Sequence, residues 1–502
     1  MLRTNKRPTS FKTALPAFAA FAITLAGTTV PAHALEGKAL FEKLFKEGTQ
    51  ITYDSIAETG GGSFSATGVK INYSGGRRSS SIKALDVIGL KETSDGRLTL
   101  EKISATELSG QGSKSDSPYT IGGLVLENSE IPYKIWEGGL TAEEKKQRMK
   151  IGALSMTSMS VQQNNGDKVD IESATLQNAD FPLDWRFDPV SSADTSDIAE
   201  PMTFDIFAIA GISGATSQGV TWDVASMTVN GAKVPTSFAA AAHAWMGVYK
   251  SINVGKISAT LAGIEVFSME SLNGTIGAPD NEGTIPSFSE VKKINVNLKA
   301  IPDPQAQAVV QQLGYETLEL DMVGDGKYNP KSGALSIDNF AMNFKDMANL
   351  NMTYGMEGYT TEVASALQQA QIKVAGGSNP QTAYAELLPI LSNLKLSNFK
   401  LGLTDKSLTG RLLDYQAGQM GTTGDQLAQG APLMIGLGLG GLNMPEFTEM
   451  VTKAVGSFLQ NKGSLEIEAA PAVPVSIVNV VLAGQTDPTK VPEMLNLKIT
   501  AN

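Results

Sequence analysis

The sequence contains no cysteine and two histidines among its 502 residues. Without cysteine the chain forms no disulfide, and a processed N-terminus offers no thiol for lipid attachment. One histidine, His33, lies in an N-terminal segment that we expect to be removed, which leaves His243. The histidine and cysteine counts exclude zinc sites built from clusters of these residues. A Ser-His-Asp triad has one candidate base.

Long apolar runs are also scarce beyond the first 34 residues. The strongest candidates lie around residues 204–212, 433–442 and 475–482. They are shorter than the ~18 apolar residues that a membrane-spanning helix needs. We therefore expect no transmembrane segment in the mature chain.

Positive charge is in short supply, with 40 Lys and Arg residues against 51 Asp and Glu residues, a formal net charge of −11. Removing residues 1–34 makes this −15, because that segment carries four basic and no acidic side chains. A chain this acidic repels nucleic acid and anionic lipid headgroups. We expect no nucleic-acid partner and no membrane binding driven by charge.

The N-terminus has the three parts of a secretory signal. Four basic residues, Arg3, Lys6, Arg7 and Lys12, precede an apolar run over 14–30 that Pro16 interrupts, and Ala32, His33 and Ala34 form a small-x-small cleavage site. We expect cleavage after Ala34 and export of the mature chain to a bacterial periplasm. A retained membrane anchor is the alternative interpretation.

A twelve-residue pattern occurs four times in the chain. Its copies are IGGLVLENSEIP at 121–132, IESATLQNADFP at 171–182, VASMTVNGAKVP at 224–235 and VKKINVNLKAIP at 291–302. Each copy has an apolar residue at its first, fourth, sixth and eleventh places and proline at its twelfth. Proline cannot donate to a strand ladder, so each copy predicts a strand that ends at the proline. Repetition of one unit predicts a repeated sheet.

The remaining segments predict an α+β fold. We expect an extended, mostly antiparallel, repeated β-sheet over residues 35–358, with short crossing helices at 141–150, 238–249 and 303–314. Residues 359–502 are expected to form a helix-rich region closed by three strands. The expected helices are 362–374, 380–391, 408–420, 426–437 and 445–461, and the closing strands lie around 465–467, 475–480 and 495–499.

No motif in the sequence identifies a reaction. His243 lies in an alanine-rich helix without a nucleophile elbow, and Ser-x-x-Lys at 80–83 and 289–292 lacks its companion motifs. The acidic groups do not match a calcium loop, and the glycines of 436–441 follow no strand and precede no lysine. The acidic groups are Asp194, Asp197 and Glu200, and Asp280 with Glu282. We expect no enzyme, no cofactor and no metal, while an unrecognised hydrolase site remains the third hypothesis.

Methionine is frequent where the alternating pattern is clearest. Methionine lines adaptable apolar surfaces, so these positions predict a ligand-binding apolar sheet face. The predicted ligand-binding residues are Met322, Met342, Leu350, Met352, Tyr354 and Met356. The alternative is that the C-terminal helices cover this face as an ordinary core.

The proline-ended copies, together with degenerate copies in the strands that follow, resemble the AsmA-like group of envelope proteins over residues 97–360. The resemblance implies a long curved β-sheet with an apolar inner face and a role in outer-membrane lipid homeostasis or assembly. That family usually keeps an N-terminal membrane anchor and has no counterpart of the region after Thr361, and none of its site residues carries over.

These observations give three functional hypotheses. The first is a non-catalytic periplasmic envelope protein whose repeated sheet binds a lipid or another apolar envelope component. The second is a structural or protein-binding scaffold of the periplasm with no ligand. The third is the unrecognised hydrolase. The expected partners are accordingly a lipid or an envelope protein.

Overall fold

The structure is a computed structural model. It describes residues 36–502 except for 46–47, 74–78, 112–116, 133–146, 164, 183–200, 235–248, 302, 376, 378 and 380–386. The contacts between residues divide the described chain into two compact units, one ending at Gly263 and the other beginning at Ile264. The expected signal segment, His243, the acidic group around Asp194 and most of the helices expected at 141–150 and 238–249 lie outside the described residues. The domain boundary expected at 358/359 stays a prediction.

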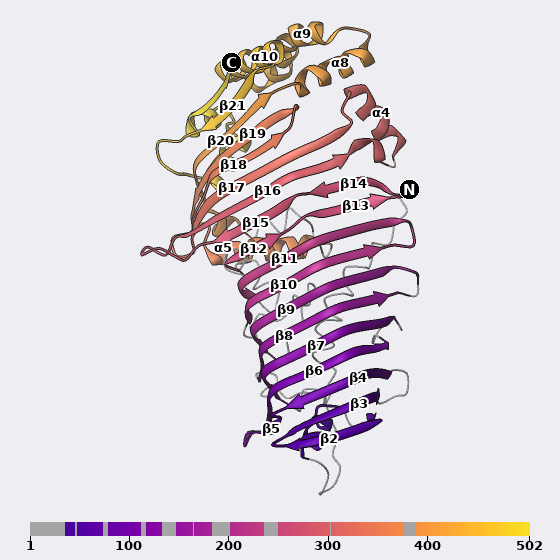
Figure 1. The fold of residues 1–502 in the computed structure, drawn as a ribbon. Coiled ribbons are helices and arrows are strands. Elements are labelled where there is room, and N and C mark those ends of the chain that lie inside the picture. Colours follow the sequence, from indigo (N-terminus) through magenta and orange to yellow (C-terminus); the bar gives the residue numbers. More distant parts are fainter. Residues whose placement is uncertain are drawn as a thin grey trace. The chain divides into compact units, whose positions relative to one another are not determined.

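The described residues of unit 1 form antiparallel strands that follow one another along the chain, with a short helix before the first strand (Figure 1). Residues 148–150, which we expected at the end of a helix, begin strand β8 instead. The elements are α2 (Glu36–Glu42), β1 (Gln50–Thr52), β2 (Ser55–Gly60), β3 (Ser63–Asn72), β4 (Ser79–Ile88), β5 (Lys91–Glu92), β6 (Arg97–Gln111), β7 (Pro118–Pro132), β8 (Arg148–Gln162), β9 (Lys168–Pro182), β10 (Met202–Ala215), β11 (Val220–Val234), β12 (Ser251–Val254) and β13 (Ile257–Leu261).

The repeated pattern corresponds to strands that do not alternate simply. In β7, before the closing and also buried Pro132, the buried side chains are Ile121, Leu124, Leu126, Ser129 and Ile131, at spacings of three, two, three and two residues. A regular strand keeps a spacing of two. Each spacing of three marks a place where two consecutive residues both lie outside the core, and one residue of the second such pair, Asn128, has a φ of 49°.

Such left-handed residues form two rows across the sheet. The first row contains Asn128 on β7, Asn178 on β9 and Gly231 on β11. Each of these residues faces a residue of ordinary φ on the neighbouring strand. The second row lies six residues away along each strand. It contains Glu107, Ser158 and Gly211, on β6, β8 and β10. Every strand from β6 to β11 therefore contributes one left-handed residue, in alternating rows.

Close approach at these rows explains particular glycines. Gly152 faces Asn128, and a Cβ atom on Gly152 would lie 2.8 Å from the Cβ of Asn128 and 2.8 Å from its carbonyl oxygen. Gly122 faces Ser158 in the second row, where an added Cβ would lie 3.0 Å from the Cβ of Ser158. The two glycines provide the space that the kinked neighbours need.

The inward side chains of unit 1 form one continuous hydrophobic cluster. Helix α2 closes its N-terminal end, where Phe41 is fully buried and its ring meets those of Phe45 and Phe64 edge to face, with centroids 5.3 and 5.5 Å apart. Edge-to-face packing is a favoured arrangement of aromatic pairs. Among the described residues, the N-terminal end of the core of unit 1 is therefore closed by aromatic side chains of α2 and β3.

Unit 2 is also built on antiparallel strands, with most of the described helices in its C-terminal half. Its elements are β14 (Ile264–Met269), β15 (Ser271–Ile276), β16 (Ile285–Asn297), η3 (Leu298–Ala300), α4 (Pro304–Leu313), β17 (Thr317–Asn329), β18 (Ala334–Phe344), β19 (Ala348–Glu357), α5 (Thr361–Ala375), α7 (Leu388–Leu391), β20 (Lys395–Asp405), α8 (Leu408–Met420), α9 (Gly424–Leu439), η4 (Gly440–Leu442), α10 (Pro445–Asn461), β21 (Ser464–Ala469), β22 (Val475–Ser476), α11 (Ile477–Thr486), α12 (Lys490–Met494) and β23 (Leu497–Ala501).

The α+β class and the mostly antiparallel sheet are confirmed. The sequence also predicted helix α4 with its caps: the Asp303 carboxylate accepts from the amide of Gln305 at 2.8 Å, and Gly314 ends the helix with a φ of 69°. The four first places of the repeat, Ile121, Ile171, Val224 and Val291, all lie in strands. The fourth copy does not stay extended to its proline as predicted, because β16 ends at Asn297 and η3 follows.

One of the three closing strands was predicted too long. Residues 475–480 were expected to form a strand, but β22 ends at Ser476 and helix α11 begins at Ile477. Strand β22 pairs with Lys395 and Leu396, the first two residues of β20. Beyond that point the neighbouring chain is no longer extended, because α7 and a turn precede β20. The apolar run therefore continues as a helix, an ambiguity that short apolar runs carry.

Candidate functional site

The six predicted ligand-binding residues lie on three adjacent strands of unit 2, with Met322 on β17, Met342 on β18 and the other four on β19. All six side chains are half-buried. Directly opposite residues of an antiparallel pair point to the same face, and residues two apart on one strand do so as well. The structure therefore brings all six to one face of the sheet.

Cross-strand pairing extends this apolar surface in rows. Met322 is opposite Met342, and Met342 is opposite Leu350. The next rows pair Phe340 with Met352, Ile337 with Tyr354 and Leu335 with Met356. We call this surface, with the strand neighbours described next, the apolar face.

Strands β20, β21 and β23 continue the apolar face. Leu403, Leu401 and Phe399 of β20 are opposite Leu350, Met352 and Tyr354, and Ile467 and Ile499 prolong the row of Met352. The sequence analysis did not assign these residues to the site. The signal was present, because 399, 401 and 403 alternate with polar residues as 350, 352 and 354 do.

Bulges keep the apolar residues on this face where their spacing is three. The register shifts between Ile337 and Phe340 on β18, so the two residues between them, Asp338 and Asn339, turn away together. Asp338 then pairs with Lys327 on the neighbouring strand at 2.7 Å. Bulges re-aim side chains in this way. Here the bulge explains the three-residue spacing between Ile337 and Phe340, which belong to a degenerate copy of the repeat without its proline.

The opposite face of the same strands is polar. Lys345 pairs with Glu319 at 3.1 Å and Lys400 pairs with Glu466 at 2.9 Å, all with partly exposed side chains. Exposed pairs of this kind contribute little to stability. They mark the solvent side of the sheet. The sheet is therefore polar on one face and apolar on the other.

The six predicted side chains on the apolar face are partly buried, and none of them is among the exposed large apolar side chains of the described residues. Helix α10 packs against β21 and β23, while α8 packs against α9 and α4. The buried hydrophobic cluster of this unit centres on Ala370 and Leu387, outside the sheet. In the described residues, none of the six predicted side chains reaches the burial seen in unit 1.

Tyrosines border the face where β19 ends. Burial raises the pKa of Tyr354 above its ordinary value, with a smaller contribution from Tyr359. The Tyr328 hydroxyl donates to the carbonyl oxygen of Tyr359 at 3.1 Å, and burial raises the pKa of Tyr328 as well. These phenols stay protonated at neutral pH, so this end of the face is uncharged but can donate hydrogen bonds.

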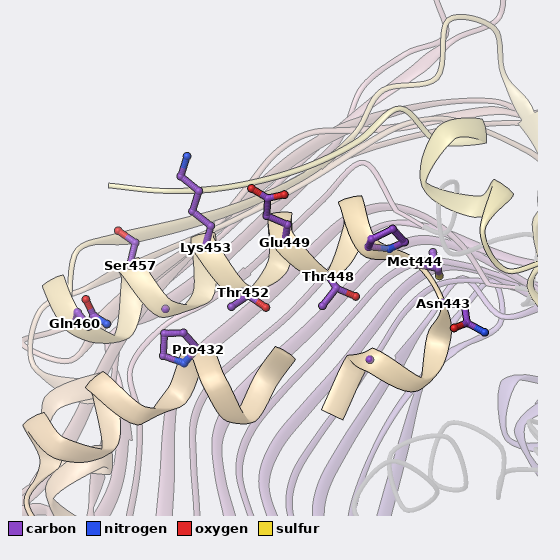
Figure 2. A pocket seen from close by; sticks show the side chains of 12 residues that line it. Pro432, Asn443, Met444, Thr448, Glu449, Thr452, Lys453, Ser457 and Gln460 are labelled. Carbon is purple, nitrogen blue, oxygen red and sulfur yellow. The ribbon is translucent and has the colours of Figure 1, made fainter. Parts of the chain in front are cut away.

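A concavity with a volume of about 980 Å³ lies between α9 and α10. Figure 2 shows Thr448 and Thr452 on the side of α10 toward α9, while Lys453 and Glu449 point the other way. The Thr452 hydroxyl is buried without a hydrogen-bond partner in the described structure. Sequence reasoning missed this groove, because no motif marks it.

The residues considered for catalysis have other contacts where they are described. Ser80 hydrogen-bonds the Tyr119 hydroxyl at 2.9 Å, and Lys83 pairs with Glu107. Lys292, the lysine of the second Ser-x-x-Lys pattern, pairs with Glu290 at 3.1 Å. These contacts give neither lysine the role of a base toward its serine.

The remaining candidates are structural where they are described. Asp280 accepts from the amides of Glu282 and Thr284, which makes it a turn residue. The glycines of 436–441 belong to α9 and η4. Among the described residues, no group of three or more histidine, aspartate or glutamate side chains could hold a metal ion. None of the described helices is long and apolar enough to cross a membrane.

Comparison with known proteins adds a family match without a function. A family model described only as an uncharacterized protein matches residues 341–502, about a third of the chain. The match covers most of the apolar face from the end of β18 onward and the helices α5 to α12. No curated protein matches this chain.

Proposed function

We propose that this chain is a non-catalytic, exported protein of the periplasm that binds the acyl chain of a lipid, or another apolar envelope component, on the apolar face of unit 2. One observation carries the proposal. The apolar face runs without interruption across β17 to β21 and β23, and its side chains are only partly buried. Contiguous apolar surface that a folded protein leaves accessible marks binding sites.

The dimensions of the apolar face suit an acyl chain. From Leu350 to Met356 the strand advances by six residues, which is about 20 Å at ~3.3 Å per residue. The hydrocarbon of one bilayer leaflet is about 15 Å deep, half of the bilayer core. An extended acyl chain can therefore lie along one strand within the face. Methionine side chains adapt to such a ligand because they are unbranched and flexible.

The periplasmic assignment is supported by the N-terminal sequence, in which basic residues, an apolar run and a small-x-small site follow in order. The absence of a reaction is supported by the contacts of Ser80, Lys83 and Lys292 described above. A screen against esters, glycosides and peptides tests the hydrolase hypothesis directly, and turnover that survives changes to the apolar face would favour it.

A pair of variants on one strand tests the proposal. Met352→Glu places a carboxylate on the apolar face, whereas Asn351→Glu adds the same charge next to it on the opposite, exposed side. We expect Met352→Glu to weaken binding of a long-chain fluorescent fatty acid at least about tenfold, because the carboxylate loses water beside the ligand. Asn351→Glu should bind as the unchanged protein does.

Two controls make the result decisive. Far-UV circular dichroism and thermal melting report whether Met352→Glu is folded, and Met352→Gln replaces it if it is not. Mass spectrometry of the purified protein, prepared without detergent, should find acyl chains in stoichiometric amount. Clean protein that also ignores the fatty-acid probe would overturn the proposal and favour a ligand-free scaffold.

A further inference from the structure

Helix α9 presents an apolar stripe to solvent. Leu433, Met434 and Leu437 are 70 %, 64 % and 74 % exposed. Leu433 and Met434 are adjacent, and Leu437 follows them by four and three residues, so the three side chains share one side of the helix. The opposite side packs on α10, where Pro432 lies next to Gly456 and Gly436 next to Thr452. The stripe is therefore the outer surface of the α9–α10 pair.

The chemistry of the stripe favours hydrocarbon over a protein partner. No charged residue occurs between Asp425 and Glu446, a stretch of twenty residues. The stripe contains leucine, methionine and glycine, which offer no side-chain hydrogen bond to a partner. Helix α8, which packs against α9, ends at Met420, and that side chain is 58 % exposed. A lipid hydrocarbon phase needs no hydrogen bonds from its partner, whereas protein interfaces form them regularly.

Length and charge define how such a helix meets a bilayer. Helix α9 has 16 residues, so it is about 24 Å long and shorter than the ~30 Å hydrocarbon core. It can lie in the interface but cannot span it. Asp425 in its first turn pairs with Lys462 at 3.3 Å, and Glu446 belongs to the first turn of α10. The chain as a whole is acidic, with a formal net charge of −11, so electrostatics disfavour anionic headgroups. The fitting surface is a zwitterionic one.

The stripe is placed at one end of the apolar face. In the sequence, helices α8 to α10 follow β20 and precede β21. The chain enters α8 where the amides of Lys406 and Ser407 donate to the Met347 carbonyl oxygen. Met347 lies in the turn three residues before Leu350, the first residue of the apolar face on β19. The start of α9 lies near the same end of the face, because Asp425 pairs with Lys462, two residues before β21, at 3.3 Å, and Leu465 of β21 is opposite Leu403.

We propose that α9 docks this protein on a zwitterionic lipid surface, with Leu433, Met434 and Leu437 inserted among the acyl chains at the end of the apolar face. The inference rests on the proposed function, because docking on a membrane would give a lipid a route to the apolar face of the sheet. Membrane docking and ligand binding are nevertheless separate properties that separate residues control.

Flotation of the mature chain with phosphatidylcholine vesicles tests the docking. The variant carries Leu433→Ser, Met434→Ser and Leu437→Ser. The control carries Ile264→Ser, Val473→Ser and Leu482→Ser, which removes three other exposed apolar side chains, 57 %, 70 % and 49 % exposed. We expect the α9 variant to lose at least about a hundredfold in vesicle partition, because each inserted side chain contributes about tenfold or more. The control should float normally, and raised salt should leave flotation unchanged.

Several results would overturn the docking. These are unchanged flotation of the α9 variant, equal loss in the control, or an unmodified chain that does not float. If the unmodified chain does not float but is a dimer that the α9 variant converts to a monomer, the stripe is an interface between copies. The fatty-acid probe, used without vesicles, separates this test from the proposed function: the α9 variant should keep its affinity, and only Met352→Glu should lose it.

Discussion

Replacing Gly152 by alanine tests the close packing of the kinked rows. The new Cβ atom would lie 2.8 Å from the Asn128 carbonyl oxygen and 3.0 Å from that of Glu127. Both are backbone atoms of the neighbouring strand β7, which the ladder holds in place on both sides. A flexible side chain could move away, but these carbonyls cannot move without shifting the strand.

The cost follows from this geometry. Forcing an extra methyl group into a closely packed site costs about 1–3 kcal/mol, and we expect Gly152→Ala to lower the free energy of unfolding of unit 1 by that amount. Gly123→Ala is the matched control, because its nearest neighbour is the Thr157 hydroxyl at 2.9 Å, the end of a side chain that can rotate. We expect the control to change stability by less than about 0.5 kcal/mol.

Urea denaturation followed by far-UV circular dichroism measures both variants, with the transition midpoint converted by linear extrapolation. Adding Asn128→Gly to Gly152→Ala should recover part of the loss, since it removes the Cβ that lies 2.8 Å from the new methyl group. Equal stabilities of Gly152→Ala and Gly123→Ala would refute the reasoning, because the backbone clash would then have no energetic consequence.

Three further changes test other parts of the structure. Burial raises the pKa of Tyr119 to about 12, so between pH 10 and 12 the unfolded phenol ionises while the folded one does not. The contribution of Tyr119 to the free energy of unfolding is full below pH 10 and is lost as the pH rises to 12. Tyr119→Phe should reduce that loss in thermal melts at alkaline pH. Arg411 donates to the carbonyl oxygens of Leu313 and Gly314 at 2.7 and 2.6 Å and lies 4.2 Å from the Tyr315 ring; Arg411→Ala should cost about 1–2 kcal/mol and speed amide exchange in α4. Asp303→Ala removes the N-cap of the same helix and should cost about 1 kcal/mol in urea denaturation, whereas Asp303→Ser should restore most of it.

Much of the fold was predictable because it is local. The repeat predicted the strands, and its three-residue step from the first to the fourth place corresponds to a position where two consecutive residues, those between Ile121 and Leu124, both lie outside the core. The caps of α4 were also readable from Asp303, Pro304 and Gly314. The end of β22 was not, because it depends on where β20 begins, far away in the sequence.

That the residues of the candidate site share one face was predictable, but their degree of burial was not. Alternation assigned Met322, Leu350 and Met352 to one face, since side-chain direction in a strand is a local property. Whether helices cover that face depends on where α8 to α10 pack, which no local pattern states. The same limit applies to α9: its apolar stripe looks like a core stripe in the sequence, and its exposure is a tertiary property.

The rows of left-handed residues constrain how this protein can change its length. A single inserted residue inside a strand would move Asn128 away from Gly152 and set its kink against a neighbour that has a Cβ atom, as at Ala153. Adding a pair of strands together with their connections would leave both rows intact. The sheet can therefore be lengthened by whole hairpins but not by single residues. The four repeat copies agree with such growth, because they begin 50, 53 and 67 residues apart while their internal spacing is constant.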